Sequence, residues 1–391
     1  MENIRFLRTP DGPQKSIEPI SPKDPSLRKI AAASKKISKS IEIVTVPKPS
    51  DMTKNRENIG IALDEAVVLG ILSKRYERVI VTEIKAQDDL DRMVARNPDL
   101  VFSGVKYFEF DSETLWLNDF LDRFGITYIA SGRKALGRES NKDRAKDIMQ
   151  KAGIATAHFF TSCPGEHPTE SSLPIAFPLF IKPITGGDSR GVDANSVVTD
   201  FPSFVAKVAE IENNQQSRSL VETYLSGKEY SVGIFEDHAT GFLTAMPIEI
   251  IVEKNQDGNR ILDFDIKRND FEKVVAVTDR EIHKKLSDMA KSAFKALGGK
   301  SIGRIDIMMN HDHTPHFIEA NLMPGLRKGY FYRSCSLNLN MNYDQMILRI
   351  ADNGLRRVRD TLIGTEGETS IPPRAGELDK GFEVALSTGS P

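Results

Sequence analysis

The strand pattern of this chain changes partway along its length. Four short apolar runs, at 41–46, 78–84, 99–105 and 126–131, alternate with helical patterns. Strands that alternate with helices are typical of a small parallel α/β domain. From about residue 177 the strand patterns follow one another with short turns between them, which favours antiparallel hairpins. The chain is therefore predicted to be α/β, with a parallel domain followed by antiparallel sheets.

Helical patterns fill the gaps between these strands. Two of them, at 57–76 and 113–125, belong to the first domain, and amphipathic helices are predicted at 140–152 and 281–299. The strand–turn–strand pattern over 219–232 reads as a hairpin.

Composition divides the chain into five segments. Residues 1–40 are rich in Pro, Ser and Lys and lack periodicity, so they are predicted to be a flexible arm that is either solvated or docked on a partner. Residues 359–391 are predicted to be a flexible tail for the same reason. The folded part is predicted to comprise an N-terminal domain at 41–135 and two further subdomains at 136–220 and 221–358.

Charge and cysteine content exclude several classes of protein. The formal net charge of −2 does not suggest a nucleic-acid binder. The two cysteines, Cys163 and Cys335, are too few and too far apart for a disulfide framework. No apolar run approaches the ~18 residues that span a bilayer, and the first residues lack the apolar core of a signal peptide. These features predict a cytoplasmic protein with no membrane partner.

Polar side chains gather on the last predicted hairpin. Because alternate residues of a strand share a face, Glu319 and Asn321 point the same way, as do Arg304 and Asp306. If the turn spans about 311–314, Asp306 lies opposite Glu319 and Arg304 opposite Asn321. Such oxygen ligands suit Mg²⁺. The alternative is a salt bridge between Arg304 and one of the two carboxylates.

A glycine-rich loop follows an apolar strand that carries Lys182. Glycines let backbone N–H groups approach phosphate oxygens, and a lysine neutralises their charge. The loop matches neither GxxxxGK[ST] nor GxGxxG, so a mobile hairpin tip remains the alternative. Its residues are Gly186, Gly187, Asp188, Ser189, Arg190 and Gly191.

Three weaker signals have plain structural alternatives. In the 219–232 segment, backbone groups near Tyr224 and Leu225 suit an adenine edge and Glu229 suits ribose hydroxyls, but ordinary solvated charges explain the same pattern. Lys142, which opens the 140–152 helix, reads alone as a surface lysine. Histidines in the last turn suit either a transition metal or an exposed polar turn; they are His311, His313 and His316.

Taken in order, these motifs resemble the ATP-grasp superfamily, and within it the D-alanine–D-alanine ligases. The resemblance runs from Lys142 through IKP and its glycine loop to ETYLSGKE and finally RID with EANLMPG. It covers about residues 95–350 and includes NPDLVFSGV, FGITYIASG and GRESNKDRAKDIMQKAGIATAHFF.

The resemblance implies a fold, a reaction and partners. Two antiparallel-sheet subdomains would clamp ATP behind an N-terminal parallel domain. A substrate carboxylate would attack the γ-phosphate to give an acyl phosphate, which an amine would convert to an amide. The implied partners are ATP, two Mg²⁺ ions with Mn²⁺ as an alternative, a small carboxylate and an amine. Relatives are often dimers, so a homodimer is one expectation.

The resemblance also implies site residues. The implied ATP contacts are Lys142, Lys182, Gly186, Gly187, Ser189, Gly191, Glu222, Tyr224, Leu225, Glu229 and Lys267. The implied metal ligands are Asp306, Glu319 and Asn321, with Glu319 bridging two ions. Arg304 and the Gly325 backbone N–H would stabilise the tetrahedral intermediate.

The chain departs from the family pattern in the predicted amino-acid pocket. A family tyrosine is here Arg268, and a serine of the glycine loop is here Asp188. A Ser-Leu pair that meets the acceptor carboxylate is replaced by Tyr330 and Phe331. Arg327 or Arg333 could meet a carboxylate instead, or be surface charges.

These departures predict an ATP-dependent carboxylate–amine ligase with a substrate other than D-alanine. The alternatives are a D-alanine–D-alanine ligase proper, a phosphotransferase, or a nucleotide-binding protein without ligase activity.

Overall fold

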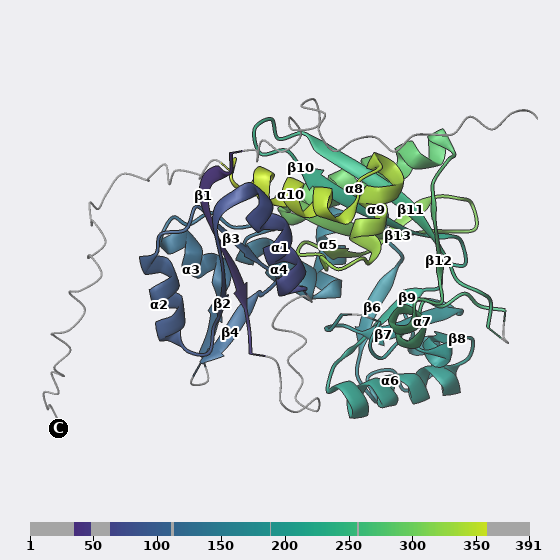
Figure 1. Ribbon diagram of the computed structural model, residues 1–391. Helices are drawn as coiled ribbons and strands as arrows, with labels where there is room; N and C mark the ends of the chain where they lie inside the picture. Colours follow the sequence, from purple (N-terminus) through teal and green to yellow (C-terminus); the bar gives the residue numbers. More distant parts are fainter. Residues whose placement is uncertain (1–34, 48–62, 111–112, 188, 256–257, 358–391) are drawn as a thin grey trace, which may run out of the picture.

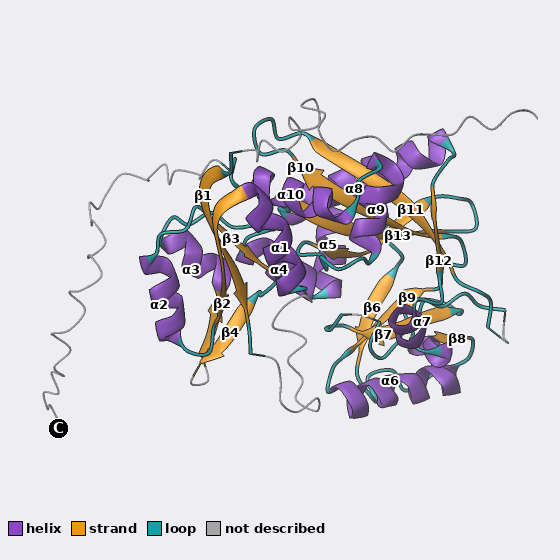
Figure 2. Cartoon of the chain, in the orientation of Figure 1, coloured by secondary structure: helices purple, strands orange, loops and turns teal. Residues whose placement is uncertain are grey.

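The computed structural model describes residues 35–47, 63–110, 113–187, 189–255 and 258–357. Figure 1 shows three bodies: an N-terminal part in purple and blue, a small teal subdomain, and a larger green and yellow one. Figure 2 shows that each body combines a sheet with helices. No helix among the described residues is long and apolar enough to cross a membrane.

The N-terminal body is the predicted parallel α/β domain. Strands β1 (Ile37–Thr45), β2 (Tyr76–Glu83) and β3 (Leu100–Ser103) form a parallel sheet in the order β2-β1-β3. Its helices are α1 (Glu65–Arg75), α2 (Gln87–Ala95) and α3 (Leu117–Arg123). The predicted strand at 126–131 is reduced to one parallel bridge between Val101 and Tyr128.

Two boundaries of the first domain differ from prediction. Residues 37–40, predicted as the end of the arm, begin β1, where Lys39 pairs with Asp99 at 2.7 Å. Residues 113–116, predicted as helix, form strand β5 (Glu113–Trp116) against β4 (Tyr107–Phe110). The Tyr107 and Trp116 rings face each other across this hairpin at 5.4 Å, and such an aromatic pair stabilises strands.

Two helices lead into the second body. α4 (Arg133–Ser140) and α5 (Lys142–Lys151) are separated by Asn141. A four-stranded sheet follows in the order β6-β9-β7-β8, and α6 (Phe201–Gln215) covers one face through Phe204, Val208 and Ile211. Its strands are β6 (Phe159–Ser162), β7 (Leu179–Pro183), β8 (Val197–Val198) and β9 (Ser219–Thr223).

The third body is a five-stranded antiparallel sheet in the order β12-β11-β10-β13-β14. Its strands are β10 (Glu229–Glu236), β11 (Leu243–Ile251), β12 (Lys273–Ala276), β13 (Ile302–Met309) and β14 (Pro315–Asn321). Its helices are α7 (Phe264–Asn269), α8 (Arg280–Leu297), α9 (Tyr330–Leu339) and α10 (Tyr343–Gly354). One parallel sheet followed by two antiparallel sheets confirms the predicted fold class.

The 219–232 segment is not the predicted hairpin. β9 pairs with β6 and β7, whereas β10 pairs with β11 and β13 in the other sheet. The turn between β9 and β10 therefore crosses from one sheet to the other. A domain boundary at 220 would cut β9, so the sheet structure favours a boundary after Thr223.

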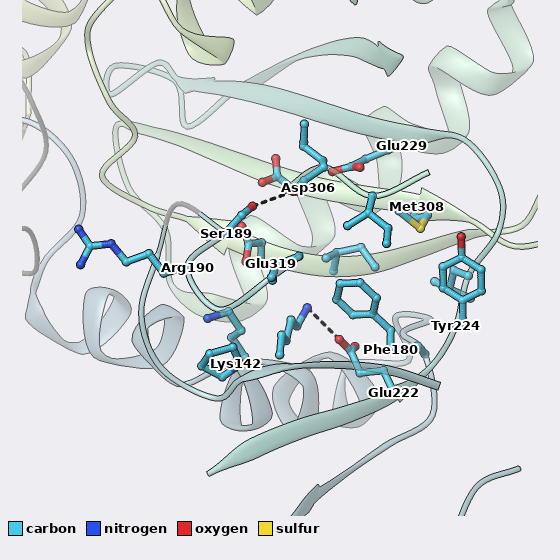
Figure 3. A pocket seen from close by; sticks show the side chains of 18 of the residues that line it. Lys142, Phe180, Ser189, Arg190, Glu222, Tyr224, Glu229, Asp306, Met308 and Glu319 are labelled. Carbon is cyan, nitrogen blue, oxygen red and sulfur yellow. Dashed lines mark hydrogen bonds and ion pairs between the residues drawn. The ribbon is translucent and has the colours of Figure 1, made fainter. Parts of the chain in front are cut away.

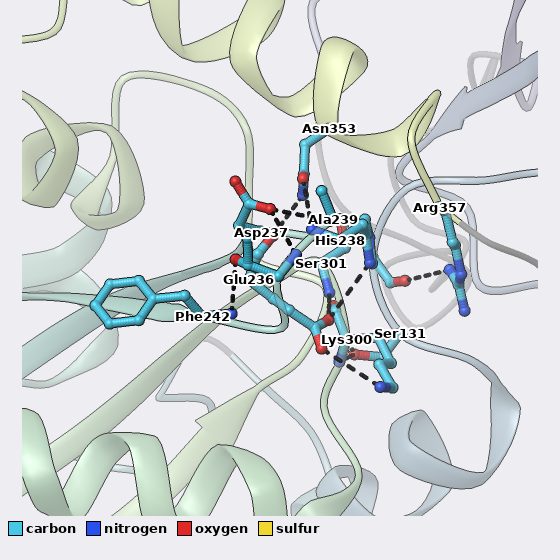
Figure 4. A network of polar contacts seen from close by, with 12 residues as sticks. Ser131, Glu236, Asp237, His238, Ala239, Phe242, Lys300, Ser301, Asn353 and Arg357 are labelled. Carbon is cyan, nitrogen blue, oxygen red and sulfur yellow. Dashed lines mark hydrogen bonds and ion pairs between the residues drawn. The ribbon is translucent and has the colours of Figure 1, made fainter.

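Polar contacts join the N-terminal body to the five-stranded sheet (Figure 4). The Lys300 N–H donates to Ser131 Oγ at 3.0 Å, and Ser131 Oγ donates back to Lys300 O at 3.3 Å. Arg357 donates to Ala130 O at 3.2 Å, and Asn353 donates to Glu236 O at 2.6 Å, which fixes α10 on β10 next to this contact. These bonds hold the first domain against the outer end of β10.

Candidate active site

A cavity that is partly open to solvent lies between the two antiparallel sheets (Figure 3). β7 and β9 supply one wall, and β10, β13 and β14 supply the other. The residues that line it and were predicted to bind ATP or metal are Lys142, Lys182, Gly186, Gly187, Ser189, Glu222, Tyr224, Leu225, Glu229, Lys267, Asp306 and Glu319. Residues from six separate stretches of the sequence thus meet at one place.

Gly191 is the predicted ATP contact that does not line this cavity. Its φ is +72°, and a Cβ at this position would lie 2.6 Å from Pro183 Cγ. The geometry explains this glycine by close packing of the loop against β7. Asp188 lies outside the described residues, as does the side chain of Arg268.

Two lysines meet one buried glutamate on the floor of the cavity. Glu222 is paired with Lys146, and its other oxygen lies 2.8 Å from Lys182 Nζ. Burial alone would raise the pKa of Glu222, but the two lysines hold it below its usual value. Burial alone would lower the pKa of Lys182, but the charges of Glu222 and Glu319 outweigh burial and raise this pKa above its usual value. Both groups therefore stay charged inside the protein.

Lys146 was missed in the sequence. It lies four residues after Lys142 on α5, and residues at this spacing share a helix face. A lysine one turn after an expected phosphate ligand was thus the signal that could have found it. No local pattern indicates that Glu222, expected to touch adenine, is the partner of this lysine.

Lys142 and the glycine loop are tied together. Lys142 Nζ donates to Gly186 O at 2.6 Å. Burial lowers the pKa of Lys142 to about 8, although Glu319 acts in the opposite direction. At neutral pH the ammonium is still mostly charged, so it can meet an anion.

Ser189 bridges the cavity to the segment before α7. Its hydroxyl donates to Leu262 O at 2.9 Å, which joins the glycine loop to the opposite subdomain. Leu262 and Lys267 both line the cavity from that side. The glycine loop and the α7 segment therefore cover the same end of the cavity.

Glu229 lies at the other side, on the first residue of β10. Burial, with Asp306 and Glu319 nearby, raises the pKa of Glu229 to about 7, while Lys267 and Lys182 act against this shift. Near neutral pH its carboxyl group can accept or donate a hydrogen bond. Figure 3 places Tyr224, Phe180 and Met308 close by, so this end is more apolar than the lysine end.

The predicted register of the last hairpin is confirmed. Asp306 pairs with Glu319 and Arg304 pairs with Asn321, with an irregularity immediately after Asp306. Arg304 donates two hydrogen bonds to the Asp306 carboxylate, from Nε at 3.0 Å and from Nη2 at 2.8 Å. The predicted alternative, a salt bridge to Arg304, is therefore present, but within β13 and not across the strands.

These side chains still fit a hard cation. Ser231 Oγ and Arg304 Nε use both lone pairs of Asp306 Oδ1, but Oδ2 accepts one bond and keeps one lone pair. Asn321 Oδ1 is buried without a hydrogen-bond partner. A metal ion would be stabilised by this unpaired oxygen together with the neighbouring carboxylates.

Glu319 completes this donor set. Burial would raise its pKa, but Lys267, Lys142, Lys182 and Arg304 together lower it to about 2. The charged carboxylate makes no direct ion pair within the described part of the chain. Among those residues no three His, Cys, Asp or Glu side chains form a metal cluster, so Asn321 is the third donor available.

Of the two aromatic residues predicted to line the substrate pocket, one lies beside the site and the other lies in the core. Tyr330 lies beside the site: its ring centroid is 5.6 Å from Arg304 Cζ, and its hydroxyl donates to Glu272 at 2.8 Å. Phe331 was wrongly placed, because it is 1% exposed and packs edge-on against Phe235. Consecutive residues of α9 point about 100° apart, so both cannot face the cavity.

The remaining predicted groups lie around this end. Arg327 is exposed, and Arg333 pairs with Asp270 and Glu272. Gly325 lies in the bend after β14, with open space where a side chain would project. In the last turn, His311 pairs with Asp312.

The sequence is similar to proteins named D-alanine–D-alanine ligase. A family model described as D-ala D-ala ligase C-terminus matches residues 148–352, just over half of the chain. The D-alanine–D-alanine ligase of Geotalea uraniireducens is 25% identical over 73% of this chain and 87% of its own length. D-alanine–D-alanine ligase A of Mesorhizobium japonicum is 28% identical over 60% of this chain and 65% of its own length.

Solved structures share the fold. D-alanine–D-alanine ligase from Bacillus anthracis superposes with a TM-score of 0.61 and 19% identity, over 82% of this chain and 98% of that one. VanG D-Ala:D-Ser ligase from Enterococcus faecalis gives a TM-score of 0.59 and 17% identity, over 81% of this chain and all of that one. The chain belongs to the D-alanine–D-alanine ligase family of ATP-grasp enzymes, which use ATP and a divalent metal to form a carbon–nitrogen bond.

Proposed function

We propose that this enzyme joins a small carboxylic acid to an amine through an acyl phosphate, and that at least one substrate is not D-alanine. The observation that carries this proposal is Tyr330, whose ring lies beside Arg304 where the family has a small serine. A phenol in place of a hydroxymethyl group takes up volume and removes a contact for the acceptor carboxylate. A neighbour of the same fold is named a D-Ala:D-Ser ligase, so the fold accommodates a changed acceptor.

The lining of the cavity supports one orientation of ATP. Lys142, Lys182 and Lys267 line one end, where their charges suit the phosphates. Tyr224 and Leu225 line the other end, where the Leu225 backbone and the Tyr224 carbonyl suit the adenine edge because the Tyr224 N–H already donates to Pro178 O, and Glu229 nearby suits the ribose hydroxyls. The Ser189 bond to Leu262 O would keep the phosphate end shielded from water.

The metal would lie on the β13–β14 hairpin. Glu319, Asn321 and Asp306 would hold Mg²⁺ or Mn²⁺, and a second ion would require Glu319 to bridge. When bound, the metal neutralises phosphate charge and orients the terminal phosphate. Arg304 holds the Asp306 carboxylate in place through its two hydrogen bonds.

The chain's own residues then account for the chemistry. A carboxylate oxygen of the acid substrate attacks the γ-phosphorus of ATP, and ADP leaves. Two events then complete the reaction: the amine nitrogen attacks the acyl carbon, and phosphate leaves with the C–O bonding electrons. Arg304 and the Gly325 N–H would donate to the oxyanion that forms between these two events. The lysines hold the phosphates in line throughout.

A D-alanine–D-alanine ligase proper is the second candidate, since the curated relatives cited above carry that name. The decisive experiment incubates the purified chain with ATP, Mg²⁺ and pairs of acids and amines, and measures ADP and phosphate with mass spectrometry of the product. We expect ADP release to need both substrates and to be faster for some other pair than for two D-alanines. D-alanine as the best pair would refute the substrate proposal, and ADP release without an amine would indicate a phosphotransferase or an idle ATPase.

A further inference from the structure

Tyr330 lies close to two guanidinium groups. Its ring centroid is 5.6 Å from Cζ of Arg304 on β13 and 6.0 Å from Cζ of Arg333, one turn further along α9. Cations over an aromatic face are attracted to its negative quadrupole. The ring therefore links the helix that follows the glycine bend to the strand that carries the metal ligands.

The ring itself is held firmly. Its hydroxyl donates to Glu272 Oε1 at 2.8 Å, and Glu272 is 7% exposed. Arg333 lies 3.5 Å from the same carboxylate oxygen and also pairs with Asp270. On the apolar side the ring packs against a cluster made of Ile250, Val252, Leu262 and Ile266.

The hydroxyl keeps its proton in this setting. Burial, the hydrogen bond to Glu272 and the charge of Glu272 all raise the pKa of Tyr330 well above its usual value, while Arg304 acts in the opposite direction. The protonated phenol therefore stays available as the hydrogen-bond donor to Glu272. This constancy is what a fixed support requires.

Arg304 is left with unused donors in a fixed orientation. Its Nε and Nη2 groups donate to Asp306, which fixes the rotation of the guanidinium within its plane. The Tyr330 ring beside it restricts the tilt of that plane. Both N–H bonds of Nη1 and one of Nη2 have no acceptor among the described residues.

We infer that Tyr330 is a positioning residue, which holds the free N–H donors of Arg304 at the place where the oxyanion forms. The inference rests on the proposed function, in which Arg304 stabilises the tetrahedral intermediate. Glu272 and Arg333 act indirectly, because they hold the Tyr330 ring in place and touch no reacting atom. Phe331, the next residue, is by contrast a core residue that packs on Phe235.

The test compares three single variants under conditions where the wild type makes product. Tyr330→Leu removes the ring, Tyr330→Phe keeps the ring and removes the hydroxyl, and Tyr332→Phe is the control, since Tyr332 packs on Tyr343 on another side of α9. We expect kcat to fall about 100-fold for Tyr330→Leu and about 3–10-fold for Tyr330→Phe, because misplacing a catalytic group by about 1 Å costs that much. KM for ATP should stay within about 2-fold, and Tyr332→Phe should match the wild type.

A double-mutant cycle separates positioning from simple structural support. In an Arg304→Lys background there is no planar guanidinium to orient, so Tyr330→Leu should cost less than about 3-fold there. Single-turnover product formation, followed with labelled ATP, gives the sensitivity that slow variants need. An equal loss from Tyr330→Leu in both backgrounds would overturn the inference, as would a Tyr330→Leu variant as active as the wild type.

The same cycle distinguishes failure of the inference from failure of the proposed function. If Arg304→Lys alone leaves kcat unchanged, Arg304 is not the oxyanion donor and the proposed mechanism fails. If Arg304→Lys is slow but Tyr330 acts independently of it, only the positioning role fails. Thermal melting of each variant shows whether a loss of activity reflects unfolding.

Discussion

Lys146 gives the sharpest test of how the phosphate end of the cavity is built. Its ammonium pairs with Glu222 and donates to Thr156 Oγ1 at 2.7 Å, and its side chain has no exposed surface. Lys182 remains 2.8 Å from the other oxygen of Glu222. Replacing Lys146 with methionine keeps most of the volume and leaves Lys182 as the one cationic partner of Glu222 in the described structure.

The magnitude follows from the burial of this cluster. Removing one partner of a buried ion pair costs about 3–5 kcal/mol, because the other charge is left uncompensated. Since Lys182 still pairs with Glu222, we expect the smaller loss of about 2–3 kcal/mol in the free energy of unfolding. Glu222 also holds Lys182 more strongly once Lys146 is gone, so ATP should bind about tenfold more weakly.

Urea unfolding measures the first effect and calorimetric titration with ATP the second. Lys151→Met is the matched control, because Lys151 is exposed on the last turn of the same helix. Adding Glu222→Gln to Lys146→Met takes the carboxylate partner from the buried ammonium of Lys182, so the double variant should be less stable than Lys146→Met alone. If Lys146→Met is as stable as Lys151→Met, the cluster does not stabilise the cavity and the reasoning fails.

Three further predictions concern single groups. Glu319→Gln should lower turnover at least about 1000-fold and abolish Mg²⁺-dependent nucleotide binding, measured by titration; near-normal turnover would contradict the metal assignment. Because the pKa of Glu229 is raised from 4.5 to about 7, the folded chain holds its proton more tightly than the unfolded chain, and this group's contribution to stability falls as pH rises through that window. Glu229→Gln should remove that slope of at most about 1.4 kcal/mol per pH unit, and urea midpoints that run parallel to the wild type from pH 4.5 to 7 would contradict it. Gly191→Ala should destabilise the chain by about 1–3 kcal/mol, since its Cβ would lie 2.6 Å from Pro183, whereas Gly187→Ala has open space; equal melting temperatures would disprove this.

The site on the last hairpin could be predicted because strand geometry is local. The period of two residues sets which side chains share a face, and the turn length sets which residues lie opposite. From these two facts the pairing of Asp306 with Glu319 followed correctly. The ordered motifs also placed most of the cavity-lining groups, because each motif carries its own strand or loop.

Contacts between distant segments could not be predicted in this way. The exit of β9 into a different sheet from β10 depends on which strands compete for its hydrogen bonds, and those strands are far away in the sequence. The same holds for Tyr330, whose partner Glu272 lies 58 residues earlier. The sequence around Tyr330 and the sequence around Glu272 contain no pattern that predicts their contact.

The sequence by itself therefore determined the succession of a parallel domain and antiparallel sheets, the faces of the last hairpin and the chemical types that meet in the cavity, since these depend on the period of the backbone and on short motifs. The tertiary structure alone decided that Lys146 is a partner of Glu222, that Phe331 faces the core and that Tyr330 faces Arg304. The physical reason is that burial and ion pairing depend on distances in space between segments that the chain keeps far apart.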